Sequence, residues 1–125
     1  MHRFILALLL LVGMTSQSWA SENGLRLIMV ERVGCHYCER WLADVGPIYP
    51  KTEVGQFAPL TMVDIGDIGD GEIKITRPVV FTPTFLVVRD DAEFARLEGF
   101  TSEDFFWSVL EDILVKKAGF TGATR

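Results

Sequence analysis

The sequence predicts an α/β domain built on a central mixed β-sheet of about four strands flanked by helices. Three observations lead to this prediction. A segment rich in branched apolar residues, Leu25–Val33, runs directly into a helical stretch. Two later apolar segments are spaced as a hairpin around residues 89–92. An amphipathic helix with one apolar face follows Thr101.

The first half of the domain is predicted to form a strand, a helical crossover and a second strand. Gly34 ends the first strand, and a helix is expected from Cys35 to about Val45. Three prolines then predict broken helix and loop, before Leu60–Ile65 forms a strand. Because a helix lies between them, these two strands are expected to be parallel. The following segment, Gly66–Pro78, is too rich in Gly and Asp to predict a helix.

The second half is predicted to be a β-hairpin followed by a helix. Its strands are Thr84–Val88 and Glu93–Glu98, which flank a short polar turn. Thr101 with Asp104 resembles a capping box in which Asp replaces the usual Glu. The helix after it has an apolar stripe at helical spacing and is expected to stop at Gly119.

Composition and charge narrow the class of protein. The 125 residues are 49% hydrophobic and 23% charged, which excludes a disordered chain. The formal charge of -5 provides no basic surface for a phosphate backbone, so nucleic acid is not expected as a partner.

The first 20 residues are predicted to be a signal peptide. Arg3 precedes the apolar run Phe4–Val12, and Ser18-Trp19-Ala20 places small residues where a signal peptidase cuts. The run is about half of the roughly 18 residues that a membrane span needs. We therefore expect cleavage after Ala20, export to the periplasm, and one domain over residues 21–125.

The chemistry is predicted at Cys35-His36-Tyr37-Cys38, which contains both cysteines of the chain. Residues i and i+3 share one face of a helix, so the two sulfurs can approach closely enough to bond. A disulfide closing so short a loop stabilises by only about 2 kcal/mol in the chain-entropy model, which favours exchange chemistry over a purely structural link. Cys35 at the helix N-terminus is the expected nucleophile, and Cys38 is expected to resolve the mixed disulfide.

Metal binding is an alternative for the two cysteines. Two thiolates with one histidine after the predicted cleavage site cannot build a four-ligand zinc site from thiolate and imidazole alone. A Cu(I) carrier with two thiolate ligands remains an alternative.

The strand leading into Cys35-His36-Tyr37-Cys38, the Thr82-Pro83-Thr84 segment before a hairpin and the final helix together resemble the thioredoxin-like superfamily. The resemblance implies that Pro83 is a cis-proline facing the cysteines, and that Pro83 and Thr82 help to bind substrate. It also implies a role for His36 and Tyr37 in binding substrate or tuning the redox pair. Residues 77–85 and 98–107 more narrowly resemble the periplasmic thioredoxins of the sulfur-oxidation (Sox) system, which keep the thiol of a sulfur-carrier protein reduced.

One departure from thioredoxins concerns the proton acceptor for the second thiol. Thioredoxins place a buried Asp six residues before the first cysteine, where this chain has Met29. Glu31, two residues later and therefore on the same face of the strand, is the candidate replacement. A solvated charge near the end of the strand is the alternative interpretation of Glu31.

The predicted function is that of a periplasmic thiol-disulfide oxidoreductase acting as a reductase on a partner protein. The expected partners are a protein thiol or disulfide, which the resemblance identifies with the sulfur-carrier protein, and a membrane electron donor. The enzyme itself is expected to be a monomer. No metal or organic cofactor is expected beyond the Cys35–Cys38 disulfide. The alternatives are a disulfide oxidase or isomerase, because the same pair of cysteines serves both directions, and the Cu(I) carrier.

Overall fold

The computed structural model describes residues 23–122. The predicted signal peptide and the predicted boundary at residue 21 lie outside these residues and stay predictions. No helix within residues 23–122 is long and apolar enough to cross a membrane.

The domain is built on a four-stranded mixed sheet with the strand order β2-β1-β3-β4. β1 (Leu25–Glu31) is parallel to β2 (Leu60–Asp64) and antiparallel to β3 (Thr84–Arg89). β3 is in turn antiparallel to β4 (Ala92–Glu98). This arrangement confirms the predicted α/β class, the mixed sheet and the strand pairing.

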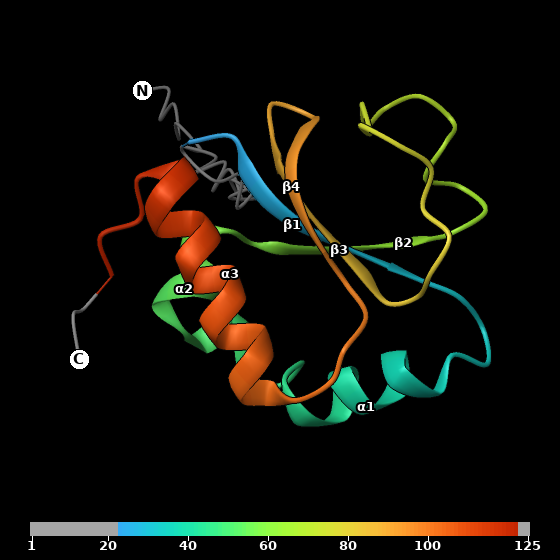
Figure 1. The fold of residues 1–125 in the computed structure, drawn as a ribbon, viewed down its shortest axis with the longest axis horizontal. Helices are drawn as coiled ribbons and strands as arrows, with labels where there is room; N and C mark the ends of the chain where they lie inside the picture. The colour runs from blue at the N-terminus through green and yellow to red at the C-terminus, as the bar shows by residue number, and fades with distance from the viewer. Residues whose placement is uncertain (1–22, 123–125) are drawn as a thin grey trace, which may run out of the picture.

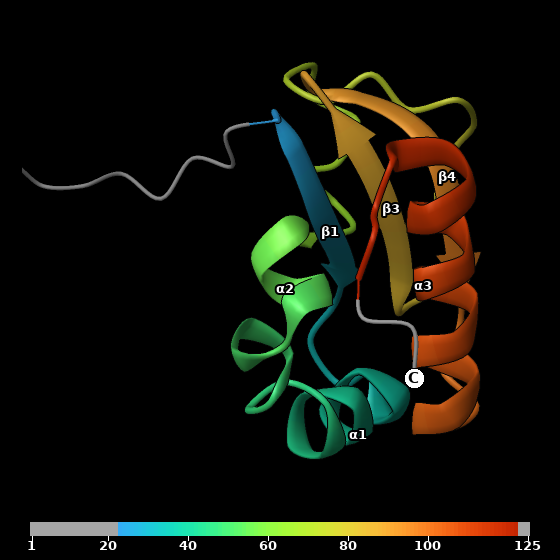
Figure 2. The ribbon, with the colours of Figure 1, turned by 90° about the vertical axis from the view of Figure 1, so that its left-hand side faces the viewer.

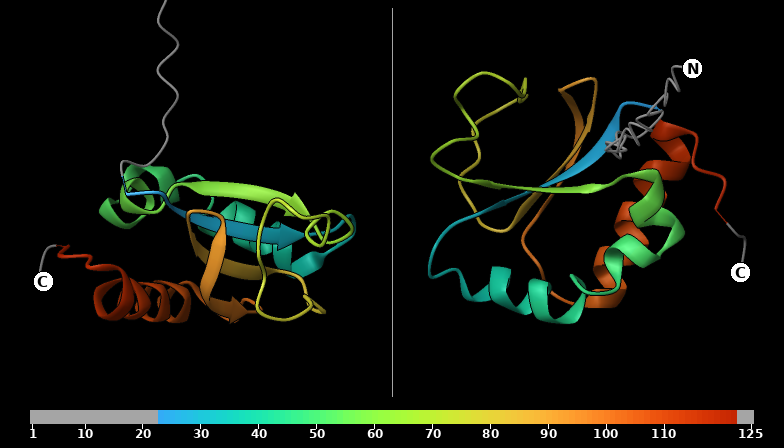
Figure 3. Two further views of the ribbon diagram at one scale, coloured as in Figure 1. Left: turned by 90° about the horizontal axis from the view of Figure 1, so that it is seen from above. Right: turned by 180° about the vertical axis from the view of Figure 1, so that it is seen from behind.

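The helices cover one face of this sheet (Figures 1 and 2). The crossover from β1 to β2 contains α1 (His36–Asp44), the short 3-10 helix η1 (Tyr49–Lys51) and α2 (Glu53–Phe57). α3 (Glu103–Ala118) packs on the same face. The opposite face is covered by the irregular connection over residues 65–83, which contains no helix, as its composition predicted (Figure 3).

Both faces of the two central strands are therefore buried, and this explains why their sequences are apolar without alternation. On the helix side, Leu27 and Met29 of β1 lie in the larger core with Phe85 of β3. On the other side, Ile28 of β1 and Leu86 of β3 pack against residues of the connection, including Ile68.

Several predicted boundaries differ from the structure. β1 ends at Glu31 and not at Val33, because the chain turns there and Gly34 adopts a positive φ of 78°. The N-cap of α3 is Ser102, not Thr101: the Ser102 hydroxyl accepts the N–H of Phe105 at 3.3 Å. The predicted capping box is thus wrong by one residue.

The predicted hairpin is present, but its turn has two residues and not the four of 89–92, because β3 continues to Arg89 and β4 begins at Ala92. Asp90 and Asp91 have φ values of 49° and 63°. A two-residue hairpin loop with both φ values positive matches the right-handed twist of its strands, and Asp tolerates this conformation better than most residues.

Candidate functional site

The site begins where β1 turns into α1. Gly34 occupies the left-handed conformation that this turn needs, and the Cys35 N–H bonds the carbonyl of Arg32 at 3.3 Å. Cys35 itself is extended and is the N-cap of α1. The turn thus delivers the first cysteine to the positive end of the helix.

Cys35 and Cys38 form a disulfide across the first turn of α1, with their Cα atoms 5.2 Å apart. The backbone N–H of Cys38 donates to Sγ of Cys35 at 3.1 Å, which is the bond that a polar N-cap side chain normally accepts. Cys35 is 8% exposed and Cys38 only 2%. The sequence prediction that the two sulfurs meet, with Cys35 the more accessible, is confirmed.

An aromatic cluster lies directly beneath the disulfide. Trp41, one turn after Cys38, is completely buried, with its ring centroid 5.1 Å from that of Phe85 and 5.4 Å from that of Phe106. The Trp41 indole N–H has no hydrogen-bond partner among the described residues. Sequence reasoning missed Trp41, although its position one helical turn after a buried cysteine could have found it.

Tyr49 of η1 extends this cluster and ties the crossover to α3. Its ring stacks on that of Trp107, with centroids 5.7 Å apart, and its buried hydroxyl donates to the Ala58 carbonyl at 2.7 Å. Burial raises the pKa of the Tyr49 phenol far above its ordinary value of 10.0. Tyr49 is therefore a neutral anchor of the helix layer.

Pro83 lies at the same end of the sheet as the cysteines. Val30, near the end of β1, pairs with Thr84 at the start of β3, so the residue before Thr84 belongs to this end. The Thr82–Pro83 peptide bond is cis, as the resemblance implied, and Pro83 is buried. Its carbonyl accepts the N–H of Gly99 at 2.7 Å.

Exposed apolar side chains flank both halves of the site. Val33 and Tyr37 come from the segment that carries the cysteines and are 99% and 53% exposed. Val80 and Phe81 come from the segment before Pro83 and are 63% and 61% exposed. We call these four residues the apolar rim. A group of exposed apolar side chains on one surface is a feature of sites that contact another protein.

The two polar candidates next to the disulfide differ in their surroundings. His36 is exposed, and its ring meets that of Tyr37 edge-on at 5.7 Å. Glu31 is half-buried at the end of β1, opposite Asp64 in the parallel register. Met29 is fully buried in the core on the helix side. The roles of His36 and Glu31 stay predictions.

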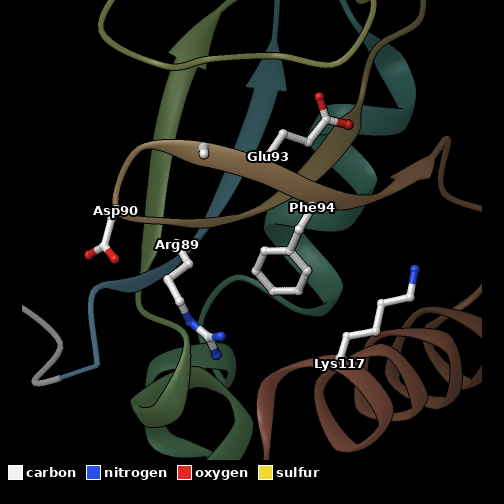
Figure 4. Close-up of a pocket in the computed structure, with 6 residues that line it drawn as sticks. Arg89, Asp90, Glu93, Phe94 and Lys117 are labelled. Atoms are coloured by element: carbon white, nitrogen blue, oxygen red, sulfur yellow. The ribbon is translucent and has the colours of Figure 1, made fainter.

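No group of three or more His, Cys, Asp and Glu side chains within residues 23–122 is arranged to hold a metal ion. Two surface hollows, of about 570 and 870 Å³, are lined by residues other than the cysteines. The smaller one lies between β4 and the end of α3 (Figure 4). In it, the Arg89 guanidinium lies 5.5 Å from the centroid of the Phe94 ring and donates to the Ala118 carbonyl at 3.2 Å, so Arg89 caps α3.

Comparison with solved structures gives similar proteins over most of the described chain. The crystal structure of the reduced periplasmic thioredoxin SoxS from Paracoccus pantotrophus is 43% identical, with a TM-score of 0.70, and the match covers 74% of this chain and 97% of that one. Thioredoxins from Malassezia sympodialis (15% identity, TM-score 0.52) and Plasmodium falciparum (20%, 0.54) share the fold. These two matches each cover 74% of this chain, and 80% and 84% of theirs. No family model and no curated protein matches the sequence.

Proposed function

Because the chain belongs to the thioredoxin-like superfamily and is a thiol-disulfide oxidoreductase, we propose that it acts in the periplasm as a reductase of a partner protein. The observation that carries this proposal is the position of the Cys35–Cys38 disulfide at the N-cap of α1. A sulfur that accepts a backbone N–H at the positive end of a helix is well placed to bear the charge of a thiolate.

The proposed reaction moves two electrons from the dithiol to the partner. The Cys35 thiolate attacks one sulfur of the partner's disulfide, and the other sulfur leaves as a thiolate that takes a proton from water. Cys38 then loses its proton and attacks the Cys35 sulfur, which forms the Cys35–Cys38 disulfide and releases the partner's second thiolate. A membrane electron donor returns two electrons and two protons. The cycle needs no metal or organic cofactor.

The residues around the disulfide have the following proposed roles. Thr82 and Pro83 bind the partner's backbone next to its disulfide, while His36 and Tyr37 contact the partner and tune the reactivity of the pair. Glu31 accepts the proton that Cys38 loses. The apolar rim supplies a surface on which a protein, rather than a small molecule, gains binding energy by burying apolar area.

The N-terminal segment and the 43% identity to the thioredoxin SoxS support a proposal for where the chain acts and on which partner. Residues 1–20 have the composition of a signal peptide, and the similar thioredoxin from Paracoccus pantotrophus is a periplasmic protein. We propose that this chain is exported, is monomeric and keeps the thiol of a sulfur-carrier protein reduced.

Trapping the partner tests the exchange mechanism. In a Cys38→Ser variant, Cys35 can attack but the mixed disulfide cannot be resolved, so a covalent complex should accumulate in periplasmic extracts. Mass spectrometry identifies the protein that is bound. The variant in which both cysteines are replaced by Ser is the matched control and should capture nothing. If the Cys38→Ser variant also captures nothing, the proposed mechanism is wrong.

The reduction potential of the pair tests the direction of electron flow. Equilibration against glutathione should give a value near about -270 mV for a reductase, whereas a value near about -120 mV identifies an oxidase. Purified protein that carries nearly one Cu(I) per chain and reduces no protein disulfide would identify the copper carrier instead.

A further inference from the structure

A buried ion pair occupies the edge strand β4. The Arg96 guanidinium meets the Glu93 carboxylate twice, Nε to Oε1 at 2.6 Å and Nη2 to Oε2 at 2.8 Å. Their side chains are only 6% and 2% exposed. Burying two charges costs much desolvation free energy, so a buried ion pair is weak evidence of a gain in stability. Its clearest effect is on the position of the residues that it contacts.

Besides a contact of Arg96 Nη1 with Glu98 Oε1 of the same strand at 3.5 Å, the remaining hydrogen bonds of the pair go to the irregular connection that covers the sheet. Arg96 Nη2 donates to the Arg77 carbonyl at 2.9 Å, and Nη1 lies 3.4 Å from the Pro78 carbonyl. Glu93 Oε2 accepts the N–H of Thr76 at 2.7 Å. Figure 4 shows Glu93 directed to the opposite side of β4 from Phe94. We call Arg96 and Glu93 the clasp.

Two further contacts fix the same segment to β4. Lys74 forms an isolated bridge with Ala92: its N–H donates to the Asp91 carbonyl at 2.8 Å, and its carbonyl accepts the N–H of Glu93 at 2.9 Å. Arg77 Nη1 donates to Glu98 Oε1 at 2.9 Å. Apart from this bridge, residues 65–83 contain no strand or helix to hold them. The clasp, the Lys74 bridge and the Arg77 ion pair therefore hold this segment against β4, as the hydrogen bonds of a regular strand otherwise would.

The segment held by the clasp is followed directly by the residues that are proposed to bind the partner protein next to the disulfide. Val80 and Phe81 of the apolar rim follow Pro78 after one residue, and the cis bond to Pro83 comes next. At its far end this stretch is held by β3, where the Thr84 hydroxyl donates to the Phe81 carbonyl at 2.8 Å. Residues 79 and 80 thus lie between two fixed points, the Arg77 and Pro78 carbonyls and the Phe81 carbonyl. The clasp holds the first of them.

We propose that Arg96, held by Glu93, is a positioning residue that sets the placement of residues 80–83 for docking of a protein substrate. This inference rests on the proposed function, because it assumes that the partner docks on the apolar rim and Pro83. A protein substrate must contact both the apolar rim and the disulfide, so displacement of residues 80–83 weakens its binding. A small disulfide needs only access to Cys35 and is not affected.

The test compares a protein disulfide with a small one. In Arg96→Met, which keeps much of the side-chain length but removes the charge and every hydrogen bond, kcat/KM for insulin reduction should fall about tenfold or more, mainly through KM. The rate with 5,5′-dithiobis(2-nitrobenzoate) should change less than about twofold. Arg26→Met is the matched control. It breaks an exposed ion pair with Asp91 on the same hairpin and should leave both rates unchanged.

A conservative variant tests the same role with a smaller loss of stability. Arg96→Lys keeps the charge next to Glu93 but lacks the planar fork that reaches both carbonyl groups, so it should show the same selective loss to a smaller degree. Circular dichroism checks that each variant is folded at the assay temperature. Equal losses with both substrates, or no loss with insulin, overturn the positioning role. Wild-type protein that reduces neither substrate overturns the proposed function itself, and this inference with it.

Discussion

Replacing Tyr49 by Phe tests whether one buried hydroxyl holds the helix layer together beneath the disulfide. The substitution keeps the ring that stacks on Trp107 and removes only the donor to the Ala58 carbonyl. Tyr49 and Ala58 are both completely buried, so water cannot replace the lost partner without a rearrangement. The carbonyl is therefore expected to lose its hydrogen bond.

The expected cost follows from that geometry. Leaving a buried acceptor without a partner costs about 1–3 kcal/mol, and the hydroxyl's own desolvation, which the variant no longer suffers, offsets part of this. We expect the free energy of unfolding to fall by about 1–2 kcal/mol. In a domain of about 100 residues each kcal/mol lowers Tm by about 4–8 °C.

Chemical denaturation measured by circular dichroism gives the free energy directly, because small domains unfold in one step. Tyr37→Phe is the matched control: Tyr37 is 53% exposed, so the loss in free energy of unfolding should be below about 0.5 kcal/mol. Equal stability of the Tyr49→Phe variant and the wild type would refute the reasoning. Disulfide reductase activity well below Tm should be unchanged, because Tyr49 contacts neither sulfur in the proposed mechanism.

Alkaline titration supplies an independent check on Tyr49. Burial raises the pKa of this phenol, so the folded state keeps a proton that the unfolded state loses near its ordinary pKa of 10.0. The stabilisation is therefore complete below pH 10 and declines as the pH rises further. In a Tyr37→Phe background, the phenolate absorbance of Tyr49 should appear only together with unfolding. Phenolate formation in protein that is still folded would contradict the assignment.

Three further predictions address the clasp and the ends of α3. Burial alone would raise the pKa of Glu93, but hydrogen bonds from Arg96 and a backbone N–H outweigh it and lower the pKa below 4.5. Glu93→Gln should therefore cost about 2–4 kcal/mol near neutral pH, and the difference from the wild type in urea unfolding should shrink as the pH falls below 4.5. Ser102→Ala should lower the free energy of unfolding by about 1 kcal/mol, measured by thermal unfolding, and Thr101→Ala should lower it much less. The reverse order would show that Thr101 is the N-cap, as the capping box predicted. Gly119→Ala, at a φ of 77°, should cost about 1 kcal/mol, and a neutral result would contradict the left-handed cap.

The junction that carries the chemistry could be predicted because its signals are local. A glycine after an apolar strand indicates a turn, and two cysteines one helical turn apart at a helix start indicate facing sulfurs. The hairpin was predictable for the same reason, although its turn is Asp90 and Asp91 alone and not all of residues 89–92. The family and the enzyme class predicted from these residues are confirmed, whereas the roles of His36 and Glu31 stay predictions.

The clasp was not predictable, because its signal is long-range. Arg96 and Glu93 are charged residues on an edge strand, where charges normally face water. Only the path of residues 74–78 across that strand buries them, and nothing in the local composition of this segment specifies the path. The alternation of β4 was equally uninformative, since a register shift between Val87 and Val88 interrupts its pairing with β3. The periodicity of a sequence therefore does not predict which side chains an irregular segment will bury.

The energetics of α1 explain how the disulfide can open while the fold persists. A bond that closes so short a loop stabilises by about 2 kcal/mol. Complete burial of Trp41 removes about 150–250 Å² from water, worth about 4–6 kcal/mol before the entropy of ordering is subtracted. Because Trp41 packs against Phe85 and Phe106, α1 is anchored to the sheet and to α3 by side chains that do not change on reduction. The sulfurs are thus held at a fixed place by packing, so their bond can break when the pair accepts two electrons and form again when the pair gives them up.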